Sequence, residues 1–407
     1  MTDRLIAAVA LPVLALAALL KRRTRLLVWG PVPVINNKYW SHAMREAGHP
    51  SVTLMREYFA AINERSDFDL YFDDVTPRWL PRRFGPYAAA YYVLRRARVL
   101  HLPFSGGPLG GTPLWRVEAQ LLRLARVRSV LIPYGADLFV EDRLLSESLR
   151  TALGRMREPD PAVEAQRAAV VDYWQRHADV IVVGFAFDGL TRIDAPVGNM
   201  IGLDLAEWPL PPPRPGHDGR NGPVTIFHAP NHQGAKGTAE IEAALETLRD
   251  EGLSVELIPR SRVPNRAISG LLADADIHAD QILVPGYGLA AIEGMASGLP
   301  VICNLSDRVY TSFLREHSFL AECPVVSATP DSIVDVLRRL VTDPEIRLRL
   351  GAAGRAYVER YHSFEAVRYV FESIYASLDG AEVDLGHLFA ESHRPPIDHP
   401  LVDHELP

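Results

Sequence analysis

Two stretches in the second half of the chain decide the fold: HAPNHQGAKGT (228–238) and ADQILVPGYGLAAIEGMASGLPVI (279–302). In each, an apolar run gives way to glycines and then to small residues with helical periodicity, which predicts a strand, a glycine-rich loop and a helix. Glycines let the backbone approach a ligand closely, and a helix N-terminus carries partial positive charge. The two stretches therefore predict two loops that face the phosphates of one ligand.

Two charged residues in these stretches suit such a ligand. Lys236 stands at the start of the first predicted helix, where its amine would favour a diphosphate. Glu293 follows Gly288 by five residues, and a carboxylate there can accept hydrogen bonds from two adjacent sugar hydroxyls. A lone Lys-Gly pair or a lone Gly-x-Gly would be an ordinary helix start, but the two motifs in this order favour a ligand site.

Around these stretches, short apolar runs alternate with amphipathic segments, the pattern of βα units and parallel sheets. Strands are predicted at 25–29, 51–55, 98–102, 129–133, 179–183, 224–228, 254–258 and 300–303, and helices at 39–47, 236–251, 287–297, 331–340, 345–361 and 364–378. The segment PLPPPRPGHDGRNGP holds six prolines and three glycines, which excludes regular structure. We therefore predict a domain over 24–208, a linker over 209–223 and a second domain over 224–379.

The second half resembles the nucleotide-binding domain of the GT-B glycosyltransferases, in particular the retaining family 4 group. The resemblance is carried by KGT before an A-x-x-x-L helix, then a G-x-G loop and E-x-M-A-x-G-x-P-V-I. It implies an α/β fold with two Rossmann-like domains facing across a cleft, and a UDP or GDP sugar as donor. It also implies that Lys236 neutralises the donor diphosphate, that Glu293 holds the ribose and that the amides of Gly288 and Leu289 meet phosphate or sugar. The predicted donor-binding residues are His232, Gly234, Lys236, Gly237, Asp280, Gly286, Gly288, Leu289 and Glu293.

The chain departs from the family pattern at two places. Pro285 stands where the family usually has an acidic residue, eight positions before Glu293, and the arginine that accompanies the diphosphate lysine is missing. Asp280 is the predicted substitute for the acidic residue, and some members of the group carry the same Asp-Gln before a Gly-Tyr-Gly loop. His232, or an arginine from the other domain, is the predicted substitute for the lost cation.

The first half supplies the remaining site candidates. His101 ends the strand of RVLHLPFSGG, and the resemblance implies that it touches the donor sugar; a histidine at the edge of the core is the alternative. Asp137, in Tyr-Gly-Ala-Asp after a central strand, is a cleft candidate, with a helix N-cap as the competing interpretation. His101, Asp137 and Lys236 are the predicted catalytic residues. The predicted acceptor loop, GPVPVINNKYW (30–40), offers Asn36, Asn37 and Lys38.

Two segments predict contact with a membrane. Residues 5–20 carry no charge and are followed by three basic residues, so 1–23 is expected to be a membrane anchor or a half-inserted helix with the body on the cytoplasmic side. A helix packed on the core is the alternative. The stretch 78–98 holds six arginines and no acidic residue, which suits an interface with anionic lipid. The alternative is a basic helix that is exposed to solvent and contacts no lipid. The membrane-surface residues predicted there are Arg78, Trp79, Arg82, Arg83 and Tyr91.

Composition excludes several other functions. The 43 basic residues and 50 acidic ones give a net charge of -7, most of which lies in an expected loosely ordered tail at 380–407. Such a chain is no dedicated nucleic-acid binder. Two cysteines, Cys303 and Cys323, cannot form a disulfide framework and are expected to be buried thiols. Neither Asp-x-Asp match (67–69 and 274–276) nor the histidines of the tail predict a metal site, and no cofactor is expected.

The sequence therefore predicts a metal-independent, hexosyl-type glycosyltransferase. Its donor would be a nucleotide-diphosphate sugar, and its acceptor a lipid-linked glycan or a surface polysaccharide at the cytoplasmic face of a membrane. Transfer with retention is implied by the resemblance. One alternative is a non-catalytic scaffold of the same fold that binds a partner, since part of the donor motif is lost. Another is a nucleotide-sugar epimerase, which would need a set of cleft carboxylates.

Overall fold

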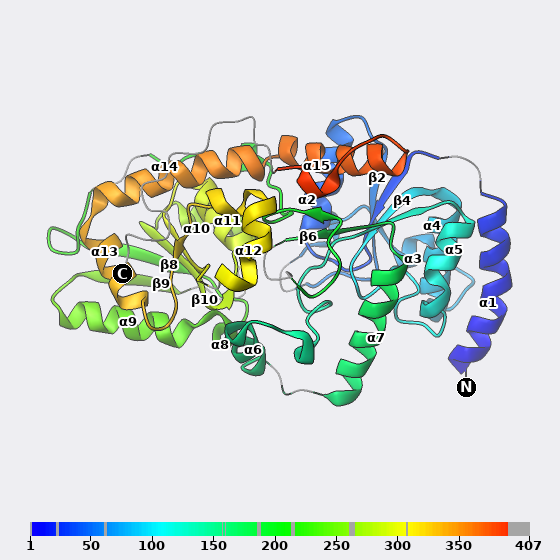
Figure 1. Cartoon of the computed structure of the whole chain (residues 1–407), viewed down its shortest axis with the longest axis horizontal. Coiled ribbons are helices and arrows are strands. Elements are labelled where there is room, and N and C mark those ends of the chain that lie inside the picture. The colour runs from blue at the N-terminus through cyan, green and yellow to red at the C-terminus, as the bar shows by residue number, and fades with distance from the viewer. Residues whose placement is uncertain are drawn as a thin grey trace.

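The computed structural model describes residues 2–21, 24–60, 63–156, 158, 160–184, 189–212, 216–259, 265–306 and 308–389. Two parallel sheets lie one after the other along the long axis of the molecule, and helices flank both (Figure 1). The strand order is β3-β2-β1-β4-β5-β6-β7 in the first sheet and β12-β11-β10-β8-β9 in the second. This arrangement confirms the predicted fold class of two Rossmann-like units.

The first sheet contains β1 (Leu26–Trp29), β2 (Ser51–Met55), β3 (Leu70–Tyr71), β4 (Ala97–Leu102), β5 (Arg128–Leu131), β6 (Val180–Val183) and β7 (Ala195–Pro196). The second contains β8 (Val224–His228), β9 (Val255–Pro259), β10 (Ile277–Pro285), β11 (Val301–Asn304) and β12 (Val326–Ser327). Each strand that we predicted lies within two residues of its expected bounds. Strands of a parallel sheet are recognisable as apolar runs because helices cover both faces of the sheet. In β6, for example, all four apolar residues are buried.

The helices of the first half are α1 (Thr2–Leu19), α2 (Asn36–Glu46), α3 (Phe72–Val75), α4 (Gly85–Arg96), α5 (Glu118–Leu124), α6 (Glu147–Gly154) and α7 (Pro161–His177). Those of the second half are α8 (Gln233–Lys236), α9 (Thr238–Asp250), α10 (Asn265–Leu272), α11 (Leu289–Ala296), α12 (Arg308–His317), α13 (Ile333–Thr342), α14 (Pro344–Tyr361) and α15 (Phe364–Leu378). Side-chain caps fix several starts. Asp343 caps α14, with Pro344 at its first turn, and Ser363 caps α15.

The strand orders place one crevice in each unit. In the first sheet the chain turns from one direction of growth to the other between β1 and β4, and in the second sheet between β8 and β10. Ligands of open parallel sheets bind outside the carboxyl ends of the strands at such switch points. The loops that follow β8 and β10 are the two glycine-rich stretches of the sequence. The fold therefore brings both predicted phosphate loops to one crevice.

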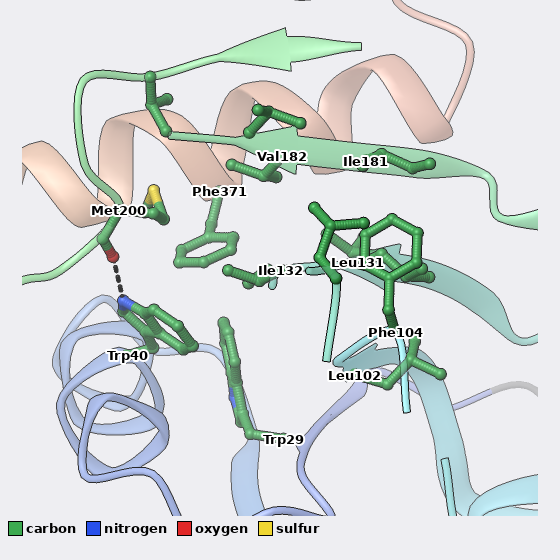
Figure 2. Close-up of a cluster of buried hydrophobic side chains, with 14 of the residues drawn as sticks. Trp29, Trp40, Leu102, Phe104, Leu131, Ile132, Ile181, Val182, Met200 and Phe371 are labelled. Carbon is green, nitrogen blue, oxygen red and sulfur yellow. Dashed lines mark hydrogen bonds between the residues drawn. The ribbon is translucent and has the colours of Figure 1, made fainter. Parts of the chain in front are cut away.

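The last long helix, α15, packs on the first sheet although its sequence follows the second. Phe371 from α15 lies 4.8 Å from Trp29 and 6.1 Å from Trp40, measured between ring centroids (Figure 2). The indole of Trp40 donates a hydrogen bond of 2.6 Å to the carbonyl of Met200 in the same cluster. The end of the chain thus completes the core of the first unit. The predicted domain bounds themselves stay a prediction, and the described residues of 209–223 contain no helix or strand.

The first residues of the expected tail, up to Phe389, make contacts with the body of the protein. Phe389 makes an edge contact with Phe319 at 4.9 Å between ring centroids, and the hydroxyl of Tyr369 donates a 3.1 Å hydrogen bond to the carbonyl of Leu388. Aromatic contacts hold this segment although it is acidic. Residues 390–407 lie outside the described residues.

The apolar N-terminal segment forms α1, which packs against α4 and α5. Ile6, Leu14 and Ala18 are buried in that contact. Among the helices of the described residues, none is long and apolar enough to cross a membrane.

Candidate functional site

The crevice of the second sheet holds an ion pair between two predicted donor residues. Lys236, the last residue of α8, pairs with Asp280 of β10, and their side chains are 15% and 2% exposed. Burial acts to raise the pKa of Asp280, but the charges of Lys236 and His278 outweigh it, so the pKa lies below its ordinary value. The aspartate is therefore charged at neutral pH. A phosphate that approaches Lys236 would compete with this carboxylate for the amine.

The glycines of the two loops differ in whether the backbone requires glycine at their positions. Gly237 has a φ of +81°, and a Cβ there would lie 2.6 Å from Cγ1 of Ile282, so only glycine fits between α8 and α9. Gly286 has a φ of +105° and donates a 2.7 Å hydrogen bond to the carbonyl of Asn304. A Cβ on Gly288 would meet nothing within 4 Å. The backbone is thus fixed on both sides of an open space in front of α11.

Glu293 lies one turn along α11 and is buried, at 3% exposure. Leu289 begins the helix, whose N-terminus has no side-chain cap. Burial raises the pKa of Tyr39 above its usual range, and the charge of Glu293 raises it further. Tyr39 belongs to α2 of the first unit. Glu293, the predicted ribose-binding residue, therefore lies close to the first unit.

An arginine from the first unit stands beside the loop that lacks the family's arginine. Arg155 follows α6 and pairs with Glu240 at 2.6 Å. A Cβ added to Gly234 would lie 3.5 Å from the Cβ of Arg155. The two sides enclose a pocket of about 430 Å³, lined by Arg155, Met156, Pro230, Asn231, His232, Gln233, Gly234 and Ala235. Two substitutes were predicted for the missing arginine, namely His232 and an arginine of the other unit. Both His232 and Arg155 line this pocket.

The helix α6 carries Arg155 to this place, and it was not predicted. Ser148 donates a hydrogen bond to the carbonyl of Leu283, and Asn304 donates one of 3.1 Å to the hydroxyl of Ser148. Ala152 packs with Ala235 and Leu283 of the second unit. The sequence signal was present, because Ser146 caps the helix and the buried residues Leu149 and Ala152 follow at helical spacing.

The crevice of the first sheet contains a small cavity of about 30 Å³. It is lined by Val32, Val34, Asn36, Asn37, Trp40, His101, Leu102, Pro103, Ile132, Pro133 and Tyr134. The amide of Asn37 donates a 2.9 Å hydrogen bond to the carbonyl of Val32, which fixes the loop. The side-chain oxygen of Asn36 is buried without a hydrogen-bond partner among the described residues. Lys38 is instead paired with Asp67 at 2.9 Å, outside the lining of the cavity.

His101 is held by the core at both ring nitrogens. Its Nδ1 lies 3.1 Å from the carbonyl of Val28, which can only accept, so Nδ1 carries the hydrogen. Nε2 then accepts from the hydroxyl of Tyr375 at 2.8 Å, and the ring stacks on Trp29 at 3.5 Å between centroids. Burial lowers the pKa of His101 to about 3, so the ring is neutral at pH 7. This geometry favours the core histidine over the predicted contact with a donor sugar.

Asp137 is likewise engaged by the backbone. One carboxylate oxygen accepts from the amide of Phe104 at 2.8 Å, and the other accepts from the amides of Tyr134 and Gly135 at 3.0 Å each. Burial raises the pKa of Asp137 to about 6, although these amides act to lower it. The residue ties two crevice loops together, which is neither the expected helix N-cap nor a free catalytic carboxylate.

Glu118 performs a similar task and was missed in the sequence. It accepts from the amides of Gly107 at 3.1 Å and Leu109 at 2.8 Å, which holds the glycine-rich loop after β4. Burial raises its pKa to about 7. The two loop residues lie eleven and nine positions before Glu118 in the chain, a spacing that marks no known motif. Only the pairing of a buried acid with a glycine-rich loop could have indicated it.

The expected membrane residues are exposed. Trp79 is 81% exposed and Tyr91 is 46% exposed. Arg78, Arg82 and Arg83 are exposed too, and Arg82 lies 3.5 Å from Asp73. Within the ranges that the structure describes, no three His, Cys, Asp or Glu side chains are arranged to hold a metal ion.

Comparison with known proteins agrees with this architecture. No family model matches the chain. A curated relative, the MMP alpha-(1->4)-mannosyltransferase of Mycolicibacterium hassiacum, is 29% identical over 118 residues. That match covers 28% of this chain and 28% of the relative, so the chain spans little more than a quarter of the relative's length.

Solved structures match over most of the chain. Sucrose-phosphate synthase from Thermosynechococcus elongatus is 15% identical, with a TM-score of 0.53 over 88% of this chain and 99% of that one. HepE of Anabaena, solved in complex with UDP, is 12% identical, with a TM-score of 0.52 over 87% and 100%. A glycosyltransferase from Rickettsia africae is 11% identical, with a TM-score of 0.50 over 88% and 99%. The chain therefore has the GT-B fold, the two-domain architecture of this class of glycosyltransferases.

Proposed function

We propose that this chain is a glycosyltransferase that transfers a sugar from a nucleotide-diphosphate donor to a lipid-linked or polysaccharide acceptor. One observation carries the proposal: the buried pair of Lys236 and Asp280 lies at the switch point of the second sheet, and Glu293 is buried one turn along α11, the helix that follows β10. The similarity to a mannosyltransferase and to GT-B structures supports the same reaction class.

The donor would be held by its charges. Lys236 and Arg155 would supply two cations to the diphosphate, the first from its ion pair with Asp280 and the second from its ion pair with Glu240. Glu293 accepts hydrogen bonds from the ribose, and the amides that open α11 face phosphate or sugar oxygens. Cations and fixed amides that stabilise the departing diphosphate lower the barrier for bond cleavage without any rearrangement of solvent.

Exchange of one ion pair would couple donor binding to sugar binding. When the diphosphate takes the amine of Lys236, Asp280 loses its partner and becomes an acceptor for a sugar hydroxyl. This role replaces the acidic residue that Pro285 cannot supply. Because Asp280 is 2% exposed, its unpaired charge would be costly, so a hydroxyl donor there gains affinity.

The acceptor would enter from the first unit. Asn36 offers an unpaired oxygen in the crevice of the first sheet, next to the glycine-rich loop that Glu118 holds. Retention of configuration, independence of metal and a place at the cytoplasmic face of a membrane belong to the same proposal, and they rest on the family resemblance and the sequence pattern.

Binding measurements on two variants test the roles in the donor site. Calorimetry should show that Lys236→Ala weakens binding of a nucleoside diphosphate at least tenfold and leaves the nucleoside nearly unchanged, whereas Glu293→Ala weakens both. Lys38→Ala is the matched control, since that lysine also pairs with an aspartate but lies in the other unit. Equal losses for nucleoside and diphosphate in Lys236→Ala would refute its role.

A non-catalytic scaffold remains the second candidate, and Pro285 favours it together with the neutralisation of Lys236 by Asp280. The two candidates differ in turnover. A scaffold that has kept the fold would bind a nucleotide without consuming any nucleotide sugar, in the presence of lipid extracts or glycans as acceptors. Release of nucleoside diphosphate that depends on an acceptor excludes it.

A further inference from the structure

The helix α1 has two apolar faces, and only one of them is covered. Ile6, Leu14, Ala17 and Ala18 are buried against α4 and α5. The opposite face exposes large side chains: Leu5 is 68% exposed, Val9 62%, Val13 53%, Leu16 56%, Leu19 64% and Leu20 60%. At 3.6 residues per turn these positions form one stripe along the helix.

This uncovered face, the α1 stripe (Leu5, Val9, Val13, Leu16, Leu19 and Leu20), carries no charge and no hydrogen-bonding side chain. It runs for about 24 Å at 1.5 Å per residue. Other exposed aliphatic residues, such as Leu348 on α14, do not belong to a stripe of this kind. Soluble proteins rarely leave a continuous apolar surface of this length without a partner.

The position of α1 allows a flat surface to reach it. The helix lies at one end of the long axis, at the outer edge of the first unit, while α9 and α13 of the second unit lie at the other end (Figure 1). Nothing in the described part of the chain folds over the stripe, since its residues keep more than half of their exposure.

Tyr91 and basic residues border the stripe. Besides burial, the charge of Asp3 raises the pKa of Tyr87, so the start of α1 lies beside the first turns of α4. At the other end, Arg95 donates a hydrogen bond to the carbonyl of Leu20. Tyr91 lies midway between Tyr87 and Arg95 on the same face of α4 and is 46% exposed. The α1 stripe is thus flanked by a half-exposed tyrosine at its middle.

A basic side chain lies at each end of the stripe. Thr24, just after α1, donates a 2.6 Å hydrogen bond to the carbonyl of Arg96, which places Arg95 and the end of α4 beside the end of α1. Arg4 is exposed at the first turn of α1. Aliphatic residues with a tyrosine and arginines at their rim match the acyl boundary and the phosphates of an anionic lipid surface.

We propose that α1 lies in the plane of an anionic phospholipid bilayer, with the α1 stripe among the acyl chains and Arg4 and Arg95 at the lipid phosphates. The helix does not leave the protein to do so, because its other face is part of the core of the first unit. This docking sets the first unit, with the predicted acceptor crevice, on the membrane and holds the second unit away from it. The docking rests on the membrane location in the proposed function, and it does not depend on the proposed reaction.

Sedimentation of the full chain with lipid vesicles tests the proposal. The chain should bind vesicles of phosphatidylcholine with phosphatidylglycerol, and more weakly those of phosphatidylcholine alone, with binding to the anionic vesicles reduced by salt. The double variant Val9→Asp/Leu16→Asp should lower the partition coefficient at least tenfold. Leu348→Asp, at a residue that is 60% exposed on α14, is the matched control and should leave binding unchanged. The double variant Arg4→Glu/Arg95→Gln should weaken binding to the anionic vesicles only.

Three outcomes would overturn the proposal. The first is that the chain does not bind anionic vesicles, and the second is that the Val9→Asp/Leu16→Asp variant binds them as well as the wild type does. The third is that the wild type sediments as a dimer and that this variant is a monomer with unchanged vesicle binding. The last result would assign the α1 stripe to a second copy of the chain. Because both substituted residues are exposed, the variant should keep the wild-type melting temperature, which separates lost docking from lost folding. Nucleotide binding by the same variant separates this proposal from the proposed reaction.

Discussion

At the scale of the residue, His101 and Asp137 show how a polar side chain at the end of a strand can be engaged by the fold. The partner of Nε2 of His101 is Tyr375, which is 274 positions away in the chain. The carboxylate of Asp137 is shared among three backbone amides of two loops. A sequence identifies the residue type and its place on the strand, but not such partners. Both residues fix the position of the strand ends and loops that border the crevice of the first sheet.

The buried ionisable groups predict a pH dependence of stability with opposing contributions. Burial holds the pKa of His101 at about 3 and those of His278 and His362 at about 4, below the ordinary 6.5. The unfolded chain therefore takes up protons first, and these histidines cost stability as pH falls below 6.5. Glu118 acts in the other direction, because its raised pKa of about 7 makes the folded state hold its proton longer.

We predict that Glu118→Gln changes the pH profile in a defined way. In the natural chain, Glu118 contributes stability below its unfolded pKa of about 4.5, and this contribution is lost as pH rises to about 7. Glutamine does not titrate, so the variant does not lose this stability as pH rises. The free energy of unfolding of the variant, relative to that of the wild type, should therefore increase by about a few kcal/mol from pH 4 to pH 8. Urea unfolding across this range measures the difference. A gap that is constant with pH would contradict the raised pKa.

At the scale of the element, the joint between α8 and α9 depends on Gly237. Gly237 and Gly252 both have a positive φ, of +81° and +86°. An added Cβ would lie within 4 Å of a neighbouring residue at Gly237 and would meet nothing within that distance at Gly252. Gly237→Ala and Gly252→Ala should both lose about 1 kcal/mol to backbone strain. Gly237→Ala should lose at least about 1 kcal/mol more, because its Cβ would meet Ile282. Equal losses of unfolding free energy would show that the α8 loop adapts without cost.

The element α6 makes a prediction about donor affinity. Arg155→Gln should weaken binding of nucleoside diphosphates about tenfold while nucleosides bind as before, since it removes a charge beside the loop 231–234. Arg150→Gln on the same helix is the control, because Arg150 pairs with Glu147 and donates to the carbonyl of Leu144. Calorimetric titration of both variants measures the effect. Equal affinity in Arg155→Gln would leave His232 as the substitute cation.

Elements were predicted well where burial is continuous and poorly where a tertiary contact decides. The strands were found because parallel strands are buried on both faces and read as apolar runs. The strands β3, β7 and β12 have two residues each, which is too short to form a pattern. The position of α6 depends on Ser148 and Ala152, whose partners all belong to the second unit. No local pattern contains that information.

At the scale of the whole molecule, the two units are joined by more than their linker. The helix α6 carries the first unit onto the ends of β10 and β11, and α15 returns to the first sheet. One apolar core accordingly includes residues of both units. The sequence predicted the two sheets and the glycine-rich loops but not these crossings, because each is decided by contacts across the molecule.

Binding of a nucleotide-diphosphate sugar in the crevice of the second sheet can be measured by titration calorimetry of the full chain with UDP, GDP and their sugar conjugates. We expect one base to bind saturably, both as the diphosphate and as the sugar conjugate, and Lys236→Ala to weaken this binding at least tenfold. If the folded protein binds none of these ligands, the proposed function is wrong.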